Sequence, residues 1–271
     1  MTEQIDFDAE IPKLRSYAFE LAKLAVDILE HAKHQEYDHL IFMTCTFVCK
    51  QLSHIQSVVA LVDVGQYKDA LTISRVMAEG YAILSWANQE PSVHPLDWRA
   101  YVWIEQFKHL YGKPDYAKHK TEIEYMLNMY CRKFLKKAKN KPQADIVPTD
   151  YLPNWRADDN KKSEFVNITV KKIFEDSKLK DIHGVLYIPA SGWVHWDSFS
   201  MAETIERKPD GGIKCGLDPK YLGAVALASG INALFGSASL LDGHLKLGFD
   251  GRLNDLYRNI EEGTKINAKS S

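Results

Sequence analysis

The sequence contains few cysteines, and their number bears on the cellular compartment of the protein and on whether its fold depends on disulfides. Only 4 of its 271 residues are cysteine, and Cys45, Cys49, Cys131 and Cys215 form no C-x-x-C pair. A chain of this length can bury a sufficient core without disulfides, so we expect reduced thiols. Residues 1–15 also lack the basic and then apolar run of a secretory signal. We therefore expect a cytoplasmic protein.

An excess of charge of one sign is missing as well. The 34 Lys and Arg residues almost balance the 36 Asp and Glu residues, for a formal net charge of −2. This balance excludes a strongly basic nucleic-acid coat protein and an acidic tail protein. The glycine-rich phosphate loops G-x-x-x-x-G-K-[ST] and G-x-G-x-x-G are absent, which disfavours nucleotide hydrolysis.

Helical periodicity is what the sequence does contain. Apolar residues recur at three- and four-residue spacing, which predicts helices over about residues 11–29, 40–64, 70–86, 97–111, 118–139 and 164–174. Prolines and aspartates over 140–160 indicate a long loop, and the Pro-Asp-Gly string within 207–212 predicts a turn in a small two-stranded ribbon. We expect an all-α fold: a single multi-helix bundle over residues 1–271, with its core at about 44–241 and a flexible tail at 264–271.

The segment 221–241 carries no charged residue and is long enough to span a bilayer. Its middle consists mostly of Gly, Ala and Ser, with Asn232 at the centre. Small residues allow helices to approach closely inside a bundle. We therefore expect the central helix of a soluble core, and no contact with a membrane.

Metal-ligating patterns are weak. Glu36 and His39 form an E-x-x-H motif, which helical di-iron proteins need on two helices, but this chain has it once. Cys45 and Cys49 lack a second pair and are typical of small buried hydrophobic residues. We expect neither a metal nor a cofactor.

Two pairs of side chains are the candidates for chemistry. Arg75 and Glu79 lie four residues apart, on one face of a largely apolar predicted helix. A surface ion pair is the alternative interpretation. Ser191 and His195 have the same spacing, and tryptophans flank the histidine. That segment is either a general acid–base site or a core histidine satisfied by a hydroxyl.

The strings G-Q-Y-K-D-A-L-T-I-S-R-V-M-A-E, residues 65–79, and Y-x-x-x-S-x-x-x-H, residues 187–195, resemble a bacterial all-helical family of unknown function. Its members share an Arg-x-x-x-Glu helix and a downstream Ser-x-x-x-His segment. The resemblance covers roughly residues 44–241. It implies that Arg75, Glu79, Ser191 and His195 belong to one site.

Such a site is similar in its ingredients to the HEPN superfamily, helical proteins of bacterial conflict systems that often cut RNA with an Arg and a His and no metal. Those enzymes carry Arg-x4–6-His within one helix, whereas Arg75 and His195 would have to meet across helices. The resemblance implies that His195 transfers a proton at the ribose 2′-hydroxyl, Arg75 stabilises the phosphate charge and Glu79 orients Arg75.

A local basic region supports contact with RNA. Residues 130–180 contain thirteen Lys or Arg against seven Asp or Glu, and a helix ending beside an exposed loop would explain the charge equally well. The expected substrate-binding residues are Trp193, Trp196, Lys133, Lys136 and Lys137.

Two hypotheses follow. The first is a metal-independent ribonuclease, or toxin-like effector of a bacterial defence system, with catalytic residues Arg75, Glu79, Ser191 and His195. The second is a non-enzymatic ligand-sensing or partner-binding module, in which the same residues form a buried structural network. The expected partners are RNA, a second copy of the chain in a homodimer, and a protein encoded in the same operon.

Overall fold

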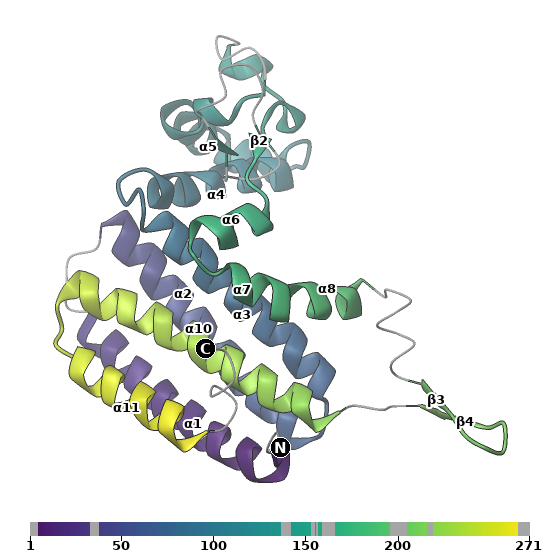
Figure 1. Ribbon diagram of the computed structural model, residues 1–271. Coiled ribbons are helices and arrows are strands. Elements are labelled where there is room, and N and C mark those ends of the chain that lie inside the picture. Colours follow the sequence, from purple (N-terminus) through teal and green to yellow (C-terminus); the bar gives the residue numbers. More distant parts are fainter. Residues whose placement is uncertain are drawn as a thin grey trace. The chain divides into compact units, whose positions relative to one another are not determined.

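The computed structural model describes residues 5–32, 38–136, 142–152, 155, 157–158, 166–195, 205–215 and 219–264. The fold is all-α, as predicted (Figure 1). The chain forms two compact units, the first from residues 1–86 and 174–271 and the second from residues 87–173. Whether they fold as the single domain expected from the sequence stays a prediction.

Long helices build the first unit. They are α1 (Phe7–Ala32), α2 (His39–Asp63), α3 (Tyr67–Ala87), α10 (Lys220–Leu245) and α11 (Asp250–Gly263), with the shorter α7 (Lys180–Ile182) and α8 (Ile188–Val194). The apolar periodicity predicted α1, α2, α3 and α10, whereas α11 was not anticipated.

Helix α10 is the central helix of this unit, with α1 and α2 packed against it (Figure 1). Gly230 allows the close approach, because an added Cβ would lie 2.9 Å from Cδ1 of Ile55. The buried hydroxyl of Ser74 on α3 also donates a hydrogen bond to the carbonyl oxygen of Ala226, at 2.7 Å. Helices α2 and α10 are both long and apolar enough to cross a membrane, and 61% of the most apolar window of α10 is buried inside the structure. Burial of this kind is typical of a core helix.

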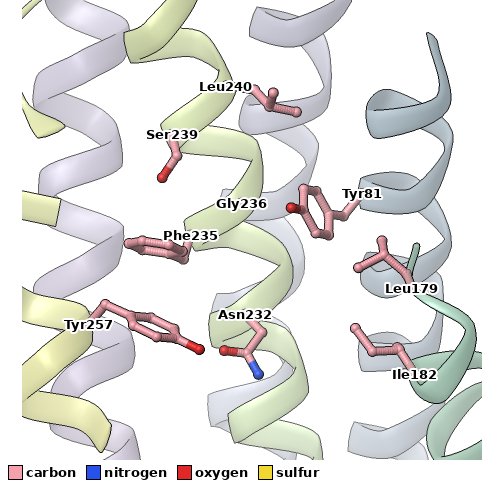
Figure 2. Close-up of a pocket in the computed structure, with 9 residues that line it drawn as sticks. All are labelled: Tyr81, Leu179, Ile182, Asn232, Phe235, Gly236, Ser239, Leu240 and Tyr257. Atoms are coloured by element: carbon pink, nitrogen blue, oxygen red, sulfur yellow. The ribbon is translucent and has the colours of Figure 1, made fainter. Parts of the chain in front are cut away.

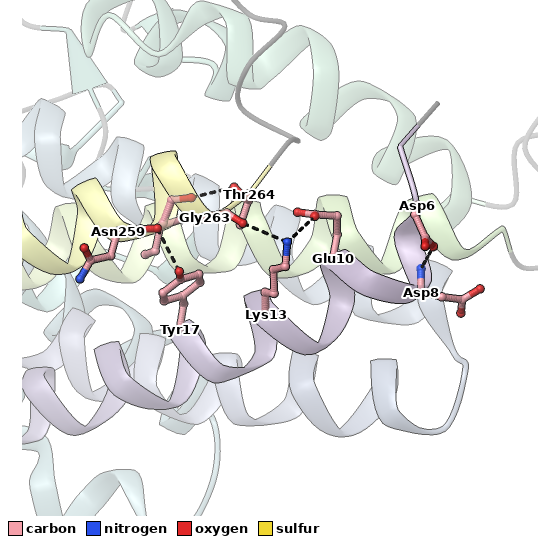
Figure 3. Close-up of polar contacts among 9 residues, drawn as sticks. Asp6, Asp8, Glu10, Lys13, Tyr17, Asn259, Gly263 and Thr264 are labelled. Atoms are coloured by element: carbon pink, nitrogen blue, oxygen red, sulfur yellow. Dashed lines mark hydrogen bonds and ion pairs between the residues drawn. The ribbon is translucent and has the colours of Figure 1, made fainter. Parts of the chain in front are cut away.

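Helix α11 lies along α1 and is held there by polar contacts (Figure 3). Its buried residues Leu253, Leu256 and Ile260 recur at helical spacing. The hydroxyl of Tyr17 on α1 donates a hydrogen bond to the carbonyl oxygen of Asn259 at 2.9 Å.

The segment 177–195 packs along α3. The Ser177 hydroxyl donates a hydrogen bond to the carbonyl oxygen of Ala82 at 2.9 Å. A π-helical turn, His183–Tyr187, joins α7 directly to α8. It comes just before Pro189, which has no amide hydrogen to continue the regular ladder. Such turns often occur at functional sites.

The second unit contains α4 (His94–Leu110), α5 (Tyr116–Tyr130), α6 (Val170–Asp176, which extends into the first unit), the 3-10 turns η1 (Arg132–Phe134), η2 (Gln143–Asp145) and η3 (Pro148–Asp150), and the strand pair β1 (Ala157–Asp158) and β2 (Val166–Asn167). The prediction that a helix runs to Lys139 was wrong, because α5 ends at Tyr130. Phe134 and Leu135 instead turn into the buried core, where Leu135 forms a bridge with Tyr151.

The predicted ribbon is confirmed as the hairpin of β3 (Ile205–Arg207) and β4 (Ile213–Cys215). The turn uses the expected chemistry. Gly211 adopts a positive φ of 82°, and the carboxylate of Asp210 accepts a hydrogen bond from the amide of Gly212 at 2.9 Å.

Candidate functional site

Arg75 on α3 contacts Tyr187, which brings the two sequence motifs together. Its guanidinium carbon lies 4.5 Å from the centroid of the Tyr187 ring, and Nη2 donates a hydrogen bond to the Tyr187 hydroxyl at 3.3 Å. Stacking of a guanidinium on an aromatic ring stabilises a partly desolvated cation. Tyr187, which lies 112 positions later in the sequence, therefore holds the Arg75 side chain in place.

Glu79 is a weaker partner of Arg75. The distance between Arg75 Nη2 and Glu79 Oε2 is 3.8 Å, beyond hydrogen-bond range, and the two side chains are 13% and 25% exposed. The two residues share one face of α3, as their spacing predicts. Glu79 supplies negative charge near the guanidinium without immobilising it.

His183 completes the aromatic side of this cluster. Its ring stacks on Tyr187 at 5.1 Å between centroids and an interplanar angle of 14°, and Phe174 packs against both rings. Sequence reasoning missed this histidine. A signal was present, because His183, Tyr187, Ser191 and His195 follow one another at four-residue intervals.

Two polar atoms on the helices that carry Arg75 and the Ser-x-x-x-His motif are buried without a hydrogen-bond partner. They are Nε of Arg75 and Oγ of Ser191, and neither atom has a partner among the residues that the structure describes. Buried polar groups are normally hydrogen-bonded. Arg75 thus keeps one unused donor, and Ser191 keeps one hydroxyl that can donate or accept a hydrogen bond.

His195 lies at the other end of α8 and is exposed. Its backbone amide donates to the carbonyl oxygen of Ser191, and its side chain makes no hydrogen bond or ion pair within the described ranges. Eight residues separate it from Tyr187, which is about 12 Å along a helix. The structure therefore links Arg75 to His183 through the Tyr187 ring that both contact, and among the described residues it shows neither His183 nor His195 in contact with Arg75.

Trp193 fixes α8 to the first turn of α3. Its indole nitrogen donates a hydrogen bond to the carboxylate of Asp69 at 3.3 Å, and the ammonium group of Lys68 lies 4.9 Å from the ring centroid. Trp193 thus makes intramolecular contacts at the position where substrate contact was expected. Trp196, its predicted companion, lies outside the described residues.

The predicted basic contact residues belong to the second unit. Lys133 pairs with the carboxylate of Asp97, and Lys136 donates a hydrogen bond to the carbonyl oxygen of Thr149 at 2.9 Å. Both ammonium groups therefore have partners within that unit. Lys137 lies outside the described residues.

Within the described ranges, no group of three or more His, Cys, Asp and Glu side chains is placed to hold a metal ion. Cys45, Cys49 and Cys131 are free thiols. Burial raises the pKa of the Cys131 thiol to about 12, so this residue is an inert core thiol.

Comparison with known proteins decides the family. Residues 41–213 match a family of unknown function, DUF5677. The chain belongs to this family. The match includes both Arg75–Glu79 and Tyr187–His195, so the predicted membership of an uncharacterised family is confirmed. No curated protein and no solved structure matches the chain. DUF5677 carries no assigned activity, and function has to be argued from the site.

Proposed function

We propose that this protein is a metal-independent ribonuclease, a toxin-like effector of bacterial defence, whose phosphate-binding group is Arg75. The observation that carries the proposal is the contact between Arg75 and the Tyr187–His195 segment, with Arg75 Nε and Ser191 Oγ left without partners. An arginine held on an aromatic ring, with an unused donor, suits recognition of a phosphodiester oxygen.

The unpartnered atoms also argue against the alternative of a purely structural network. Such a network stabilises a fold only when its buried members satisfy one another. Here the Arg75–Glu79 pair is long, and the Ser191 hydroxyl has no partner among the described residues. A phosphate oxygen beside the guanidinium would satisfy Arg75 Nε.

The chemistry needs one proton acceptor and one proton donor. The ribose 2′-oxygen attacks phosphorus as its proton passes to a neutral imidazole, and the bond from phosphorus to the 5′-oxygen breaks as that oxygen takes the proton from the imidazolium so formed. The products are a 2′,3′-cyclic phosphate and a 5′-hydroxyl. Arg75 stabilises the charge that develops on the phosphate oxygens.

We assign the proton transfer to His183, because it stacks on the ring that Arg75 contacts. His195, the histidine singled out by sequence, lies about 12 Å further along the helix from Tyr187. Glu79 acts as a positioning residue, since its carboxylate lies 3.8 Å from the guanidinium.

The test is incubation of the purified protein with total bacterial RNA in the presence of a chelator. Arg75→Ala, His183→Ala and His195→Ala are assayed beside the parent protein, with thermal unfolding of each recorded. Arg258→Ala is the control, because Arg258 forms an exposed ion pair on α11, away from this cluster.

We expect cleavage by the parent protein, by Arg258→Ala and by His195→Ala, and its loss in Arg75→Ala and His183→Ala without loss of folding. Loss of RNA cleavage in His195→Ala alone would show that His195, and not His183, transfers the proton. Absence of cleavage in the parent protein, with a lowered melting temperature in Arg75→Ala, would instead support the structural network.

A further inference from the structure

A pocket of about 430 Å³ lies between α3, α7, α10 and α11, within the first unit (Figure 2). Arg75, Tyr187 and His183 do not line it. Its walls are mainly aromatic and aliphatic, and no charged side chain lines it. All of its lining residues except Gly236 are half-buried, so a solute can reach them. The volume is in the range of small-molecule sites.

Aromatic rings form two sides of the pocket. Tyr81 on α3 packs directly against the backbone of α10, because Gly236 has no side chain and an added Cβ would lie 2.2 Å from the Tyr81 ring. On the other side, the rings of Phe235 and Tyr257 lie 4.7 Å apart between centroids. Figure 2 shows Tyr81 on one side of the Gly236 backbone and the Phe235–Tyr257 pair on the other. The exposed part of either aromatic surface can stack on a flat molecule.

Asn232 supplies the amide group in the pocket lining, which also contains the Ser239 hydroxyl. It lies in the middle of a helix that has no charged residue between Tyr221 and Leu241, and its side chain lines the pocket (Figure 2). Within the described part of the chain its amide forms no hydrogen bond. An amide offers an adjacent donor and acceptor. Asn232 can therefore recognise a ligand edge that carries the complementary pair.

Tyr257 on α11 contributes no charge to the pocket. Burial raises the pKa of Tyr257, and the nearby carboxylate of Glu261 raises it further. The phenol is therefore neutral at physiological pH, and the lining contains no cation to balance the charge of an anion. A neutral ligand is favoured.

We propose that this pocket binds a nucleobase, either in a free nucleoside or at the end of a single-stranded RNA. Proteins recognise unpaired bases by stacking them on aromatic side chains and hydrogen-bonding their edges, and an Asn amide pairs with such an edge through two hydrogen bonds. Tyr81, Tyr257 and Asn232 supply these elements. Base binding does not require RNA cleavage, so the proposal stands separately from the ribonuclease.

The test measures binding and leaves cleavage aside. Adenosine, guanosine, cytidine and uridine are titrated into the full chain by calorimetry, and 2′-O-methyl hexanucleotides, which cannot undergo 2′-oxygen attack, are titrated in parallel. Asn232→Leu removes the amide on an otherwise apolar helix, and Leu240→Trp fills the pocket. Asn259→Leu is the matched control, since Asn259 is exposed on α11, and thermal unfolding verifies the fold of each variant.

We expect at least one nucleoside or hexanucleotide to bind the parent protein and Asn259→Leu equally, and to bind both pocket variants about tenfold more weakly or worse. Tighter binding of the hexanucleotide than of its nucleoside would identify RNA as the source of the base, and the reverse would identify a free nucleoside. The proposal fails if nothing binds the parent protein, or if folded Asn232→Leu and Leu240→Trp bind as the parent does.

Discussion

The ammonium group of Lys13 donates a hydrogen bond to the carbonyl oxygen of Gly263 at 3.2 Å, although 250 residues separate the two in sequence (Figure 3). The same group contacts the carboxylate of buried Glu10 at 2.9 Å. A cation at the carboxyl end of a helix satisfies carbonyl groups that have no partner within the helix. Lys13 thus fastens the last turn of α11 to α1.

Lys13→Met is expected to lower the free energy of unfolding by about 1 kcal/mol, because it removes the hydrogen bond to Gly263 and the ammonium group beside Glu10. Urea denaturation measures this change, and hydrogen exchange is expected to accelerate in α11 before other helices. Lys118→Met is the control, since the exposed Lys118–Asp115 pair has the same i, i+3 spacing. Equal destabilisation by both substitutions would contradict the role of Lys13.

Gly236→Ala is expected to destabilise the protein by about 1–3 kcal/mol, because the new methyl group would overlap the Tyr81 ring. Gly243→Ala, two turns further along α10, is the control. An added Cβ at Gly243 meets nothing within 4 Å, so this change should stabilise the helix by about 0.5–1 kcal/mol. Thermal unfolding measures both, and shifts of the same sign would show that Tyr81 does not pack against Gly236.

Two substitutions of Tyr187 distinguish the contribution of its ring to stability from that of its hydroxyl. Tyr187→Phe keeps the ring under the Arg75 guanidinium and loses one long hydrogen bond, so stability should fall by less than about 1 kcal/mol. Tyr187→Ala also loses the packing with Phe174 and His183, and about 2 kcal/mol or more is expected. Urea unfolding distinguishes them. If Tyr187→Phe cost as much as Tyr187→Ala, the hydroxyl would be the main anchor.

The stability of the protein should decline in mild acid. Burial lowers the pKa of His54 and of His244 from 6.5, with Lys50 adding to the effect at His54 and Asp38 opposing it at His244. Both imidazoles are therefore neutral in the folded state. As pH falls below about 6.5 the unfolded chain binds protons more readily, and the folded state loses stability until these histidines are protonated in it as well.

Unfolding free energies measured between pH 8 and pH 5 check this expectation. Replacing both His54 and His244 by Phe should reduce the loss of stability on acidification, whereas replacing exposed His119 should leave it unchanged. An unaltered pH dependence in the double variant would show that other groups control it.

Periodicity was a good guide where one face of a helix is buried, as in α1 to α4. It failed where tertiary packing overrides a helical pattern. The basic run after Tyr130 has good helix formers, yet Phe134 and Leu135 are more stable in the core of the second unit than on an extended α5. Helix α11 had the required spacing at Leu253, Leu256 and Ile260, and that signal was overlooked.

The candidate site was predictable only in part. Four-residue spacing placed Arg75 with Glu79, and placed Ser191 on the same stripe as Tyr187. The contact between Arg75 and Tyr187 depends on how two helices 112 residues apart dock, and nothing local in either segment specifies that. His183 was not predicted, although the same four-residue spacing, extended by one turn, reaches it. The proposed nucleobase pocket could not be predicted from the sequence, because its lining residues come from four helices that meet only in the folded chain.

The position of α10 has a practical consequence for fragments of this chain. The family match ends at residue 213, but α10 begins at Lys220 and covers Ile55 on α2 and Met77 on α3. A fragment limited to residues 41–213 would leave these apolar faces open to water and prone to aggregate. A fragment of this chain cloned at those boundaries should therefore be insoluble, and extending it at both ends to include α1 and α10 should restore solubility.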